Sequence, residues 1–186
     1  MIRGYIAQSA DGYVADRDGG VGFLDPFQTD EAGKDYEAFL QTIDTVVMGR
    51  TTYDQIVGFG MGWPYEGKRA IVVTSRELRG DGADPIGAPE VWAGGIAPLA
   101  RHLHDTVQGD TWVVGGPRLQ SAFLADGHLD RLDLFIMPVF LGGGVRLFES
   151  DAVGPTMALR EATEMAKGVV KLAYEASLTA CTSGQA

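Results

Sequence analysis

The sequence predicts an α/β protein with a mixed, mostly parallel central sheet, helices on both faces and a C-terminal antiparallel hairpin. As far as residue 124, apolar β-branched runs alternate with segments of helical period, the pattern of successive βα units. Beyond residue 131, strand-like runs follow one another with no helix between them, which predicts antiparallel pairing. With 186 residues, we expect one domain over residues 1–178 and a disordered tail over residues 179–186.

The first third of the chain predicts two strands, a loop and a helix. Residues 2–7 and 13–15 are expected strands joined by the turn 9–12, and a loop rich in Gly and Asp follows at 16–25. Residues 30–42 predict an amphipathic helix, because apolar residues stand at 36, 39, 40 and 43.

The middle of the chain repeats the alternation. Expected strands are 45–48, 69–74, 91–93 and 111–114, and expected helices are 51–57, 98–107 and 117–124. The last of these helices begins with proline, which the first turn of a helix tolerates. In the final third, residues 131–140 predict a long strand, and residues 157–164 and 169–177 predict a hairpin turned near Lys167 and Gly168.

Composition restricts the partners. The net charge of −10 argues against nucleic acid and anionic membranes, which bind clustered Lys and Arg. No apolar run is long enough to span a bilayer, and the N-terminus does not have the pattern of a signal peptide, so we expect a cytoplasmic protein. One cysteine, Cys181, excludes an internal disulfide, and the three histidines form no metal signature, so no metal site is expected.

Two strand-to-helix junctions contain glycine, in the segments 47–53 and 112–117. A glycine between a buried strand and a helix start exposes backbone N–H groups, and the positive end of the helix attracts a phosphate. A single Gly-Gly pair is usually a turn, but two such junctions favour a nucleotide cofactor.

Five ordered motifs together resemble a known superfamily. They are Ser9-Ala10-Asp11-Gly12, Met48-Gly49-Arg50-Thr51-Thr52-Tyr53, Val73-Thr74-Ser75-Arg76, Val113-Val114-Gly115-Gly116-Pro117, and the segment 133–144 that ends in Gly142-Gly143-Gly144. The chain resembles the dihydrofolate-reductase-like superfamily, and within it the reductase domain of the riboflavin-biosynthesis deaminase-reductase and its stand-alone relatives. This resemblance implies a three-layer α-β-α fold, hydride transfer from NADPH and a homodimer.

The resemblance also assigns cofactor-binding residues. It places one set of residues against the cofactor pyrophosphate and nearby phosphates, and a second set at the adenosine 2′-phosphate. The second set contains two hydroxyls and a guanidinium, which suit a phosphate dianion. The first set is Gly115, Gly116, Gly49, Arg50 and Thr51; the second is Thr74, Ser75 and Arg76. Arg76 has an alternative interpretation as a solvated charge at a strand end.

Two acids are candidate catalytic residues. Asp35 precedes Phe39 by four residues on the first expected helix, the spacing that folate reductases have between their acid and a packed aromatic. The alternative for Asp35 is an acid favoured by the helix macrodipole. Asp11 is the second candidate, because the family's Ser-x-Asp-Gly turn borders the substrate cleft, although Asp-Gly is also ordinary turn chemistry.

Three residues are candidate substrate contacts. The resemblance places Ser9 in the turn beside the cleft and Phe23 in a loop over the nicotinamide. Lys68 stands where folate reductases have an arginine for the substrate carboxylate, and because lysine cannot form the bidentate fork, folate is disfavoured.

The predicted function is therefore an NADPH-dependent reductase of the riboflavin-biosynthesis type, acting on a small pyrimidine- or pteridine-like substrate. The sequence contains no His-x-Glu with a Pro-Cys-x-x-Cys partner, so the deaminase half is not expected. The alternatives are a dihydrofolate reductase and a non-catalytic NADPH-binding sensor.

Overall fold

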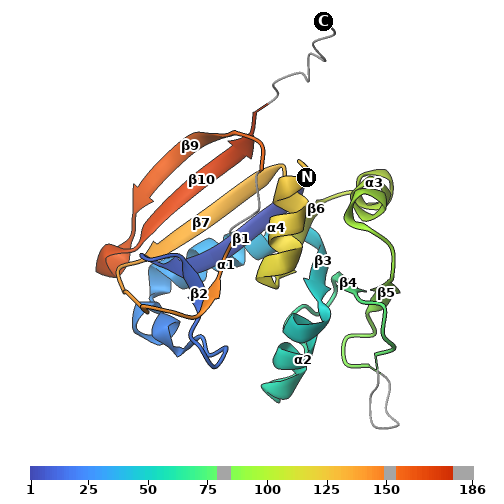
Figure 1. Ribbon diagram of the computed structural model, residues 1–186, viewed down its shortest axis with the longest axis horizontal. Helices are drawn as coiled ribbons and strands as arrows, with labels where there is room; N and C mark the ends of the chain where they lie inside the picture. The colour runs from blue at the N-terminus through green and yellow to red at the C-terminus, as the bar shows by residue number, and fades with distance from the viewer. Residues whose placement is uncertain (79–84, 149–153, 178–186) are drawn as a thin grey trace, which may run out of the picture.

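A computed structural model describes residues 1–78, 85–148 and 154–177. Its main feature is one eight-stranded sheet with the order β5-β4-β3-β6-β1-β7-β10-β9, beside a small second sheet of β2 and β8 (Figure 1). The first six strands of that order run parallel, and β10 pairs antiparallel with both β7 and β9. The predicted mixed, mostly parallel sheet is confirmed, whereas the predicted tail and Cys181 lie outside the described residues.

The strands lie close to their predicted positions. Their bounds are β1 Ile2–Ser9, β2 Tyr13–Ala15, β3 Ile43–Gly49, β4 Arg69–Val73, β5 Glu90–Trp92, β6 Asp110–Gly115, β7 Arg131–Met137, β8 Val145–Arg146, β9 Met157–Glu164 and β10 Val170–Ala176.

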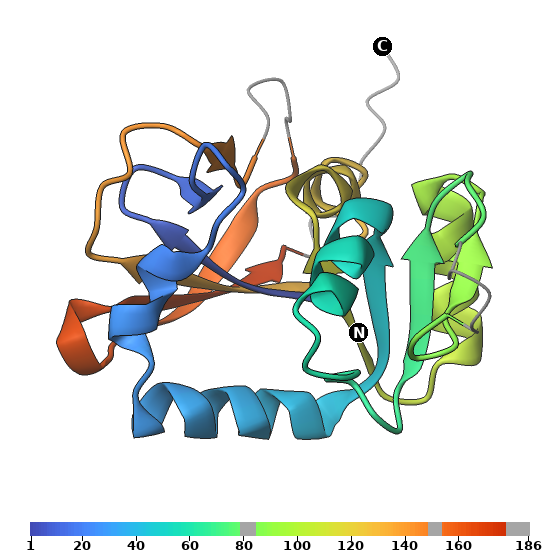
Figure 2. The same cartoon turned by 90° about the horizontal axis from the view of Figure 1, so that it is seen from below.

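The helices form a layer on each face of the sheet. Their bounds are α1 Asp30–Thr42, α2 Arg50–Gly58, α3 Ile96–Thr106 and α4 Pro117–Ala125. Neighbouring residues of β3 show the two faces: Met48 is buried with residues of α1 and α2, and Val47 with residues of α3 and α4. Figure 2 shows α1 running along one side of the sheet. The three-layer α-β-α arrangement is therefore confirmed.

Helix α1 begins and ends as its sequence predicts. The Thr29 hydroxyl accepts a hydrogen bond from the Ala32 N–H at 3.2 Å, which caps the first turn, and Asp30 and Glu31 place negative charge at its positive end. Phe39 packs under the sheet beside Tyr5, with ring centroids 4.2 Å apart. This packing fixes which face of α1 meets β1.

The structure contains a short strand that was not predicted, β8, and it differs from the prediction in two further places. Strand β7 ends at Met137 and not at residue 140, because Pro138 has no N–H to donate and the Val139 N–H turns back to the Met137 carbonyl at 2.7 Å. The predicted loop also contains a 3₁₀ turn, η1, over Gly22–Phe27. Both features lie beside the hollow described below.

The C-terminal hairpin turns where predicted. A 3₁₀ turn, η2, covers Ala166–Gly168, with positive φ at Lys167 (62°) and Gly168 (76°). Strand β10 then enters the sheet between β7 and β9, so the last described strand has neighbours on both sides. None of the helices in residues 1–78, 85–148 and 154–177 is long and apolar enough to cross a membrane.

Candidate active site

The two glycine junctions lie side by side at the carboxyl ends of adjacent parallel strands. In the pairing of β3 with β6, Met48 is opposite Gly115, so the residues that follow each strand begin helices at the same edge. Gly49 is the N-cap of α2 and Gly116 the N-cap of α4, and neither helix has a side-chain cap. Two uncapped helix ends thus direct backbone N–H groups and positive dipoles to one place, which suits a phosphate-bearing ligand.

Gly115 and Gly116 leave little room for a side chain. Gly115 has a φ of +155°, which side chains rarely adopt. A Cβ on Gly115 would lie 3.4 Å from the Thr52 hydroxyl oxygen, and one on Gly116 would lie 3.3 Å from it. The prediction attributed these glycines to the approach of a cofactor, and the structure adds the close approach of Thr52 on α2.

The end of β4 adds polar groups to the same edge. Val73 pairs with Gly49, so Thr74, Ser75 and Arg76 follow β4 next to the start of α2. The Thr74 hydroxyl accepts the Arg76 backbone N–H at 3.0 Å, and Arg76 is exposed. In the described part of the chain no hydrogen bond or ion pair engages the Arg76 guanidinium.

Arg50 and Thr51 occupy the first turn of α2. The Arg50 Nε lies 2.7 Å from a carboxylate oxygen of Asp54, and its Nη1 donates to the Glu77 carbonyl at 2.8 Å. The Arg50 side chain therefore ties α2 to the segment after β4, while Thr51 is exposed. The predicted cofactor residues thus come together at the ends of three neighbouring strands, and their binding role stays a prediction.

Asp35 lies at the centre of a polar cluster between α1 and the sheet. Lys171 of β10 donates from Nζ to Asp35 Oδ1 at 2.5 Å, and the Tyr5 hydroxyl of β1 donates to Oδ2 at 2.8 Å. The Asp35 and Lys171 side chains are 25% and 20% exposed, so the pair is partly shielded but reachable from solvent. Asp35 is thus an anchored carboxylate and not a solvated helix charge.

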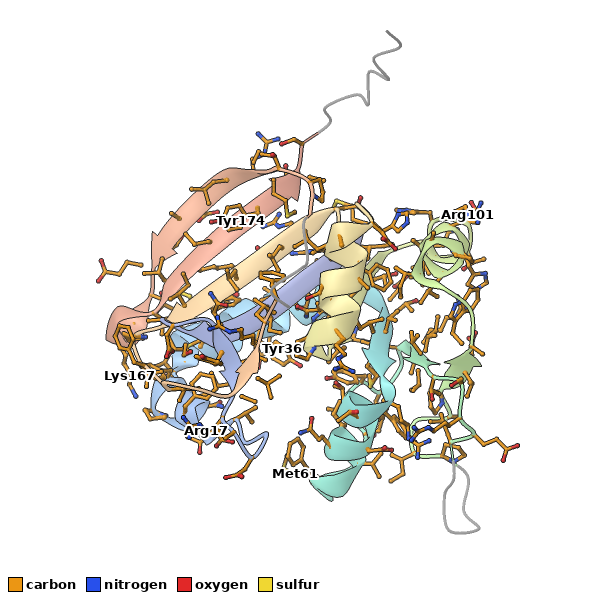
Figure 3. All side chains as sticks on the ribbon, viewed as in Figure 1. Arg17, Tyr36, Met61, Arg101, Lys167 and Tyr174 are labelled. Atoms are coloured by element: carbon orange, nitrogen blue, oxygen red, sulfur yellow. The ribbon has the colours of Figure 1, made fainter. Side chains whose placement is uncertain are left out.

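Aromatic rings surround this cluster. Tyr5 stacks on Phe39 and lies 4.6 Å from the Phe135 ring, between centroids. Burial, together with the hydrogen bond that the hydroxyl donates to the Asp35 carboxylate, raises the pKa of the Tyr5 hydroxyl well above its ordinary value. Tyr5 therefore remains a neutral donor that orients Asp35. The ring centroid of Tyr36 of α1, labelled in Figure 3, lies 5.9 Å from that of Tyr5.

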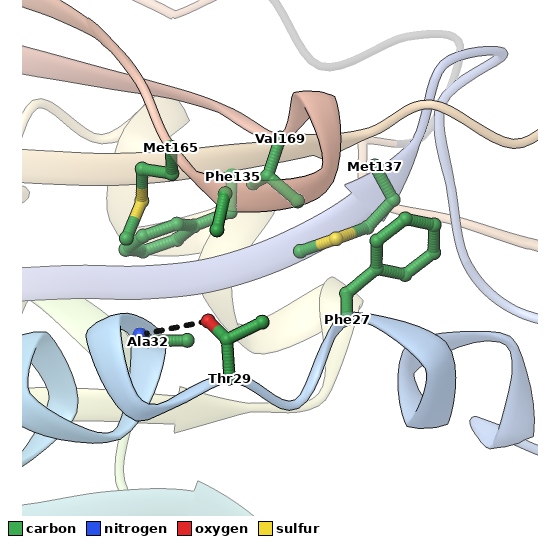
Figure 4. Close-up of a pocket in the computed structure, with 8 residues that line it drawn as sticks. Phe27, Thr29, Ala32, Phe135, Met137, Met165 and Val169 are labelled. Atoms are coloured by element: carbon green, nitrogen blue, oxygen red, sulfur yellow. Dashed lines mark hydrogen bonds between the residues drawn. The ribbon is translucent and has the colours of Figure 1, made fainter.

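A small hollow of about 40 Å³, partly open to solvent, lies next to the cluster (Figure 4). Apolar and sulfur-bearing side chains converge on it from η1, α1, β7 and the hairpin. The lining residues are Phe27, Thr29, Ala32, Phe135, Met137, Met165, Ala166 and Val169. Apart from Thr29 the lining side chains are apolar, as in most small-molecule sites.

Asp11 and Ser9 are occupied by the turn in which they stand. The Ser9 hydroxyl donates to Asp11 Oδ1 at 2.7 Å, and the Asp11 carboxylate also accepts the backbone N–H groups of Leu141 and Gly142 at 3.1 and 2.8 Å. The bond from Ser9, followed by these N–H groups, lowers the pKa of Asp11. A carboxylate held in this way is a poor proton donor, and it links the β1 turn to the segment after β7.

Lys68 and Phe23 have packing roles in the structure. Lys68 Nζ donates to the carbonyls of Leu40 and Ile43 at 2.8 and 2.7 Å, which satisfies the C-terminal end of α1. Phe23 packs against the hydrophobic cluster that contains Phe135 and Met137. Their roles toward substrate stay predictions. Across the described ranges, no group of three His, Cys, Asp or Glu side chains could hold a metal.

Sequence reasoning missed Lys171, Tyr5 and most of the lining of the hollow. One signal for Lys171 was available, because it is a charged residue in the middle of an apolar strand segment and shares a face with Ala173. The ring residues carried no such signal, since Phe and Met in strands usually belong to a core.

Comparisons with known proteins agree with this architecture. The sequence matches the family described as the RibD C-terminal domain over residues 2–171. It is 33% identical over 144 residues to uncharacterized protein YwjB of Bacillus subtilis, covering 77% of this chain and 80% of that protein.

Solved structures show the same fold. A putative riboflavin biosynthesis protein from Shewanella has a TM-score of 0.80 at 23% identity, with 94% of this chain and 97% of that chain covered. Dihydrofolate reductase from Enterococcus faecalis has a TM-score of 0.65 at 18% identity, with coverages of 94% and 95%.

The Thermotoga maritima diaminohydroxyphosphoribosylaminopyrimidine deaminase/5-amino-6-(5-phosphoribosylamino)uracil reductase has a TM-score of 0.71 at 17% identity. The match covers 95% of this chain but 56% of that protein, so the chain corresponds to about half of the bifunctional protein. With a family match over residues 2–171 and a fold shared with these reductases, the chain belongs to the RibD C-terminal domain family.

Proposed function

We propose that the protein is an NADPH-dependent reductase that transfers a hydride to a small pyrimidine-like substrate, as in the reductase step of riboflavin biosynthesis. The observation that carries this proposal is the pair of uncapped, glycine-led helix ends at the carboxyl ends of β3 and β6. Membership of the RibD C-terminal domain family supports the same reaction class.

The residues at this edge fit a phosphorylated dinucleotide. Backbone N–H groups at Gly49 and Gly116 would receive the pyrophosphate, because both helix ends have no competing side-chain cap. The exposed Arg76, with the hydroxyls of Thr74 and Ser75, suits a 2′-phosphate dianion. These features favour NADPH over NADH.

The substrate half of the site fits a small ring. NADPH supplies the hydride when bound, so the protein has to hold the ring, exclude water and provide a proton. The apolar hollow would contact the ring. Asp35 and Lys171 form the candidate proton-carrying pair, since Lys171 Nζ lies 5.4 Å from the centroid of the lining Phe135 ring. Folate is disfavoured, because Lys68 stands at the position that would hold the folate carboxylate. Its ammonium group instead donates to the carbonyls of Leu40 and Ile43, where α1 ends and β3 begins.

The test is the loss of reduced-nicotinamide absorbance with the ribosylamino-pyrimidinone phosphate and, separately, with dihydrofolate. We expect turnover with the pyrimidine and none with dihydrofolate. Turnover with dihydrofolate alone would replace the proposal by a folate reductase. NADPH binding without turnover of either compound would replace it by a sensor, and absence of NADPH binding would refute it.

We further propose that the protein is a homodimer joined through a sheet edge. Strand β9 is the last strand of the sheet within the described residues, and its Leu159 is 53% exposed. An exposed edge strand with apolar side chains is a ready surface for pairing with another copy. Sedimentation equilibrium that finds monomers alone would refute this assembly.

A further inference from the structure

A buried amide lies beside the junction between β6 and α4. The Gln120 side chain of α4 is 1% exposed, and its Nε2 donates to the Val113 carbonyl of β6 at 2.9 Å. Its Oε1 is also buried and has no hydrogen-bond partner among the described residues. A buried oxygen without a partner destabilises the fold, because it has lost its hydration, and an apolar side chain here would avoid that cost. Stability alone therefore does not account for the amide.

The amide lies at a place where β6 is irregular. Val47 of β3 is opposite Val113. The next residue of β3, Met48, is opposite Gly115, so Val114 is an extra residue in β6. On the other side of β6, the pairing with β1 ends at Val113. The chain has neighbours on both sides as far as Val113 and on one side only beyond it.

Gln120 holds this irregular stretch at both ends. Its side chain binds the Val113 carbonyl, before the extra residue, and its backbone N–H donates to the Gly116 carbonyl at 3.2 Å, after it. A strand bends at an extra residue, which changes the direction of the groups that follow. The double contact of Gln120 therefore fixes how Gly115 and Gly116 leave the sheet.

We propose that Gln120 is a positioning residue, which holds Gly115 and Gly116 in the arrangement that receives a pyrophosphate group. This inference rests on the proposed reductase function, in which that group belongs to NADPH. Backbone N–H groups bind an anion well only when they point at it together, so a small loss of orientation lowers affinity without unfolding the protein. Gln120 acts through the backbone on either side of the glycines and not by contact with the ligand.

The test compares Gln120→Met with the wild type in two titrations of the full chain, one with inorganic pyrophosphate and one with NADPH. Methionine has a similar length and no amide. We expect Gln120→Met to weaken the binding of both ligands by about tenfold, the equivalent of one lost hydrogen bond. Tm should change by no more than a few degrees, because the variant loses the bond to Val113 and also loses the unpaired Oε1.

The matched control is Ser121→Ala, at the next residue of α4. Ser121 is also buried, at 5% exposed, and its hydroxyl donates to the Leu147 carbonyl at 3.3 Å, which is not part of the junction. Ser121→Ala should lower Tm and leave both affinities unchanged. Wild-type affinities in Gln120→Met would make Gln120 a purely structural residue and overturn the inference.

Gln120→Glu is a second variant, and it decides the question if Gln120→Met does not fold. Its protonated carboxyl group has the length of glutamine and an O–H that can donate to the Val113 carbonyl, whereas the ionised group has no donor. Its affinity for pyrophosphate, relative to the wild type at the same pH, should therefore be near normal in acid and fall as the pH rises. A relative affinity that stays low at every pH would overturn the inference.

The two ligands together separate this inference from the proposed function. Pyrophosphate binding that depends on Gln120, with no binding of NADPH, would uphold the inference and refute the reductase. NADPH binding that is equal in the wild type and Gln120→Met would overturn the inference and leave the reductase standing. A wild type that binds neither ligand would overturn both.

Discussion

The proposed cofactor end and the proposed substrate end of the molecule are built in different ways. At the cofactor end each element is local: a strand, a glycine and the first turn of a helix, repeated at Gly49 and Gly116. At the substrate end the central contacts join Asp35 to Lys171, 136 residues away, and to Tyr5, 30 residues away. A site made of local units can be read from short motifs, whereas a site made of distant contacts depends on the fold. The two ends should therefore respond separately to mutation.

The largest expected effect is at the substrate end. Asp35→Asn should lower kcat by about 100-fold or more, because the amide loses the negative charge that holds Lys171 and offers one acceptor oxygen in place of two. The NADPH dissociation constant should stay within about twofold of the wild type. Steady-state kinetics and a cofactor titration check this, with Glu37→Gln, an exposed acid on the same helix, as the control. An equal loss of NADPH affinity would mean that the two ends are coupled.

The next effect tests the cofactor end. Gly115→Ala should weaken NADPH binding by about 10- to 100-fold and lower the free energy of unfolding by about 1–3 kcal/mol, because a φ of +155° is unfavourable with a Cβ and Thr52 lies close. Gly33→Ala is the matched control. Gly33 lies within α1 with no atom within 4 Å of an added Cβ, so alanine there should stabilise the helix by about 0.5–1 kcal/mol. Wild-type NADPH affinity in Gly115→Ala would contradict the assignment of this junction.

Within the cofactor end, Arg76 should distinguish NADPH from NADH. Arg76→Ala should weaken NADPH by about tenfold and leave NADH unchanged, because the guanidinium would contact the 2′-phosphate alone. Arg101→Ala removes an exposed arginine on α3 and should change neither affinity. Fluorescence titration with both cofactors checks this, and equal losses for both would rule out the 2′-phosphate contact.

The smallest expected effect concerns Asp11, which belongs to neither the cofactor end nor the substrate end. Asp11→Asn should lower Tm by a few degrees at neutral pH, because an amide cannot accept from Ser9, Leu141 and Gly142 as a carboxylate does. The folded-state pKa of Asp11 is lowered, so this stabilisation is fully present above the unfolded value of about 3.9 and is lost as the pH falls through the lower folded value.

The Tm difference between Asp11→Asn and the wild type should therefore shrink in acid. Thermal unfolding at several pH values measures it, with Asp18→Asn as an exposed control. Normal Tm with lost turnover would return Asp11 to the list of catalytic residues.

How well each feature could be predicted depends on how far apart in the sequence its interacting residues lie. Helix α1 is bounded by a threonine cap and a strand, both encoded nearby, and its observed span matches the predicted residues 30–42. Strand β7 was predicted too long because Pro138, which ends it, lies within a run of apolar residues.

The site divides in the same way. The glycine junctions were predictable, because each lies within one short segment that joins a strand to a helix. The partners of Asp35 were not, since they depend on the register of β10 against β7, which no short segment encodes. Lys68 likewise looked available for substrate until the fold placed it against the end of α1.

The place of β10 in the sheet has a consequence for the order in which the protein is made. It is the last described strand in the chain, yet it lies between β7 and β9. Synthesis proceeds from the N-terminus, so a growing chain that has emerged through α4 already contains both glycine caps, while Lys171 still has to be added. On the ribosome, we expect the segments of both glycine junctions to be complete before the contact between Asp35 and Lys171 can form.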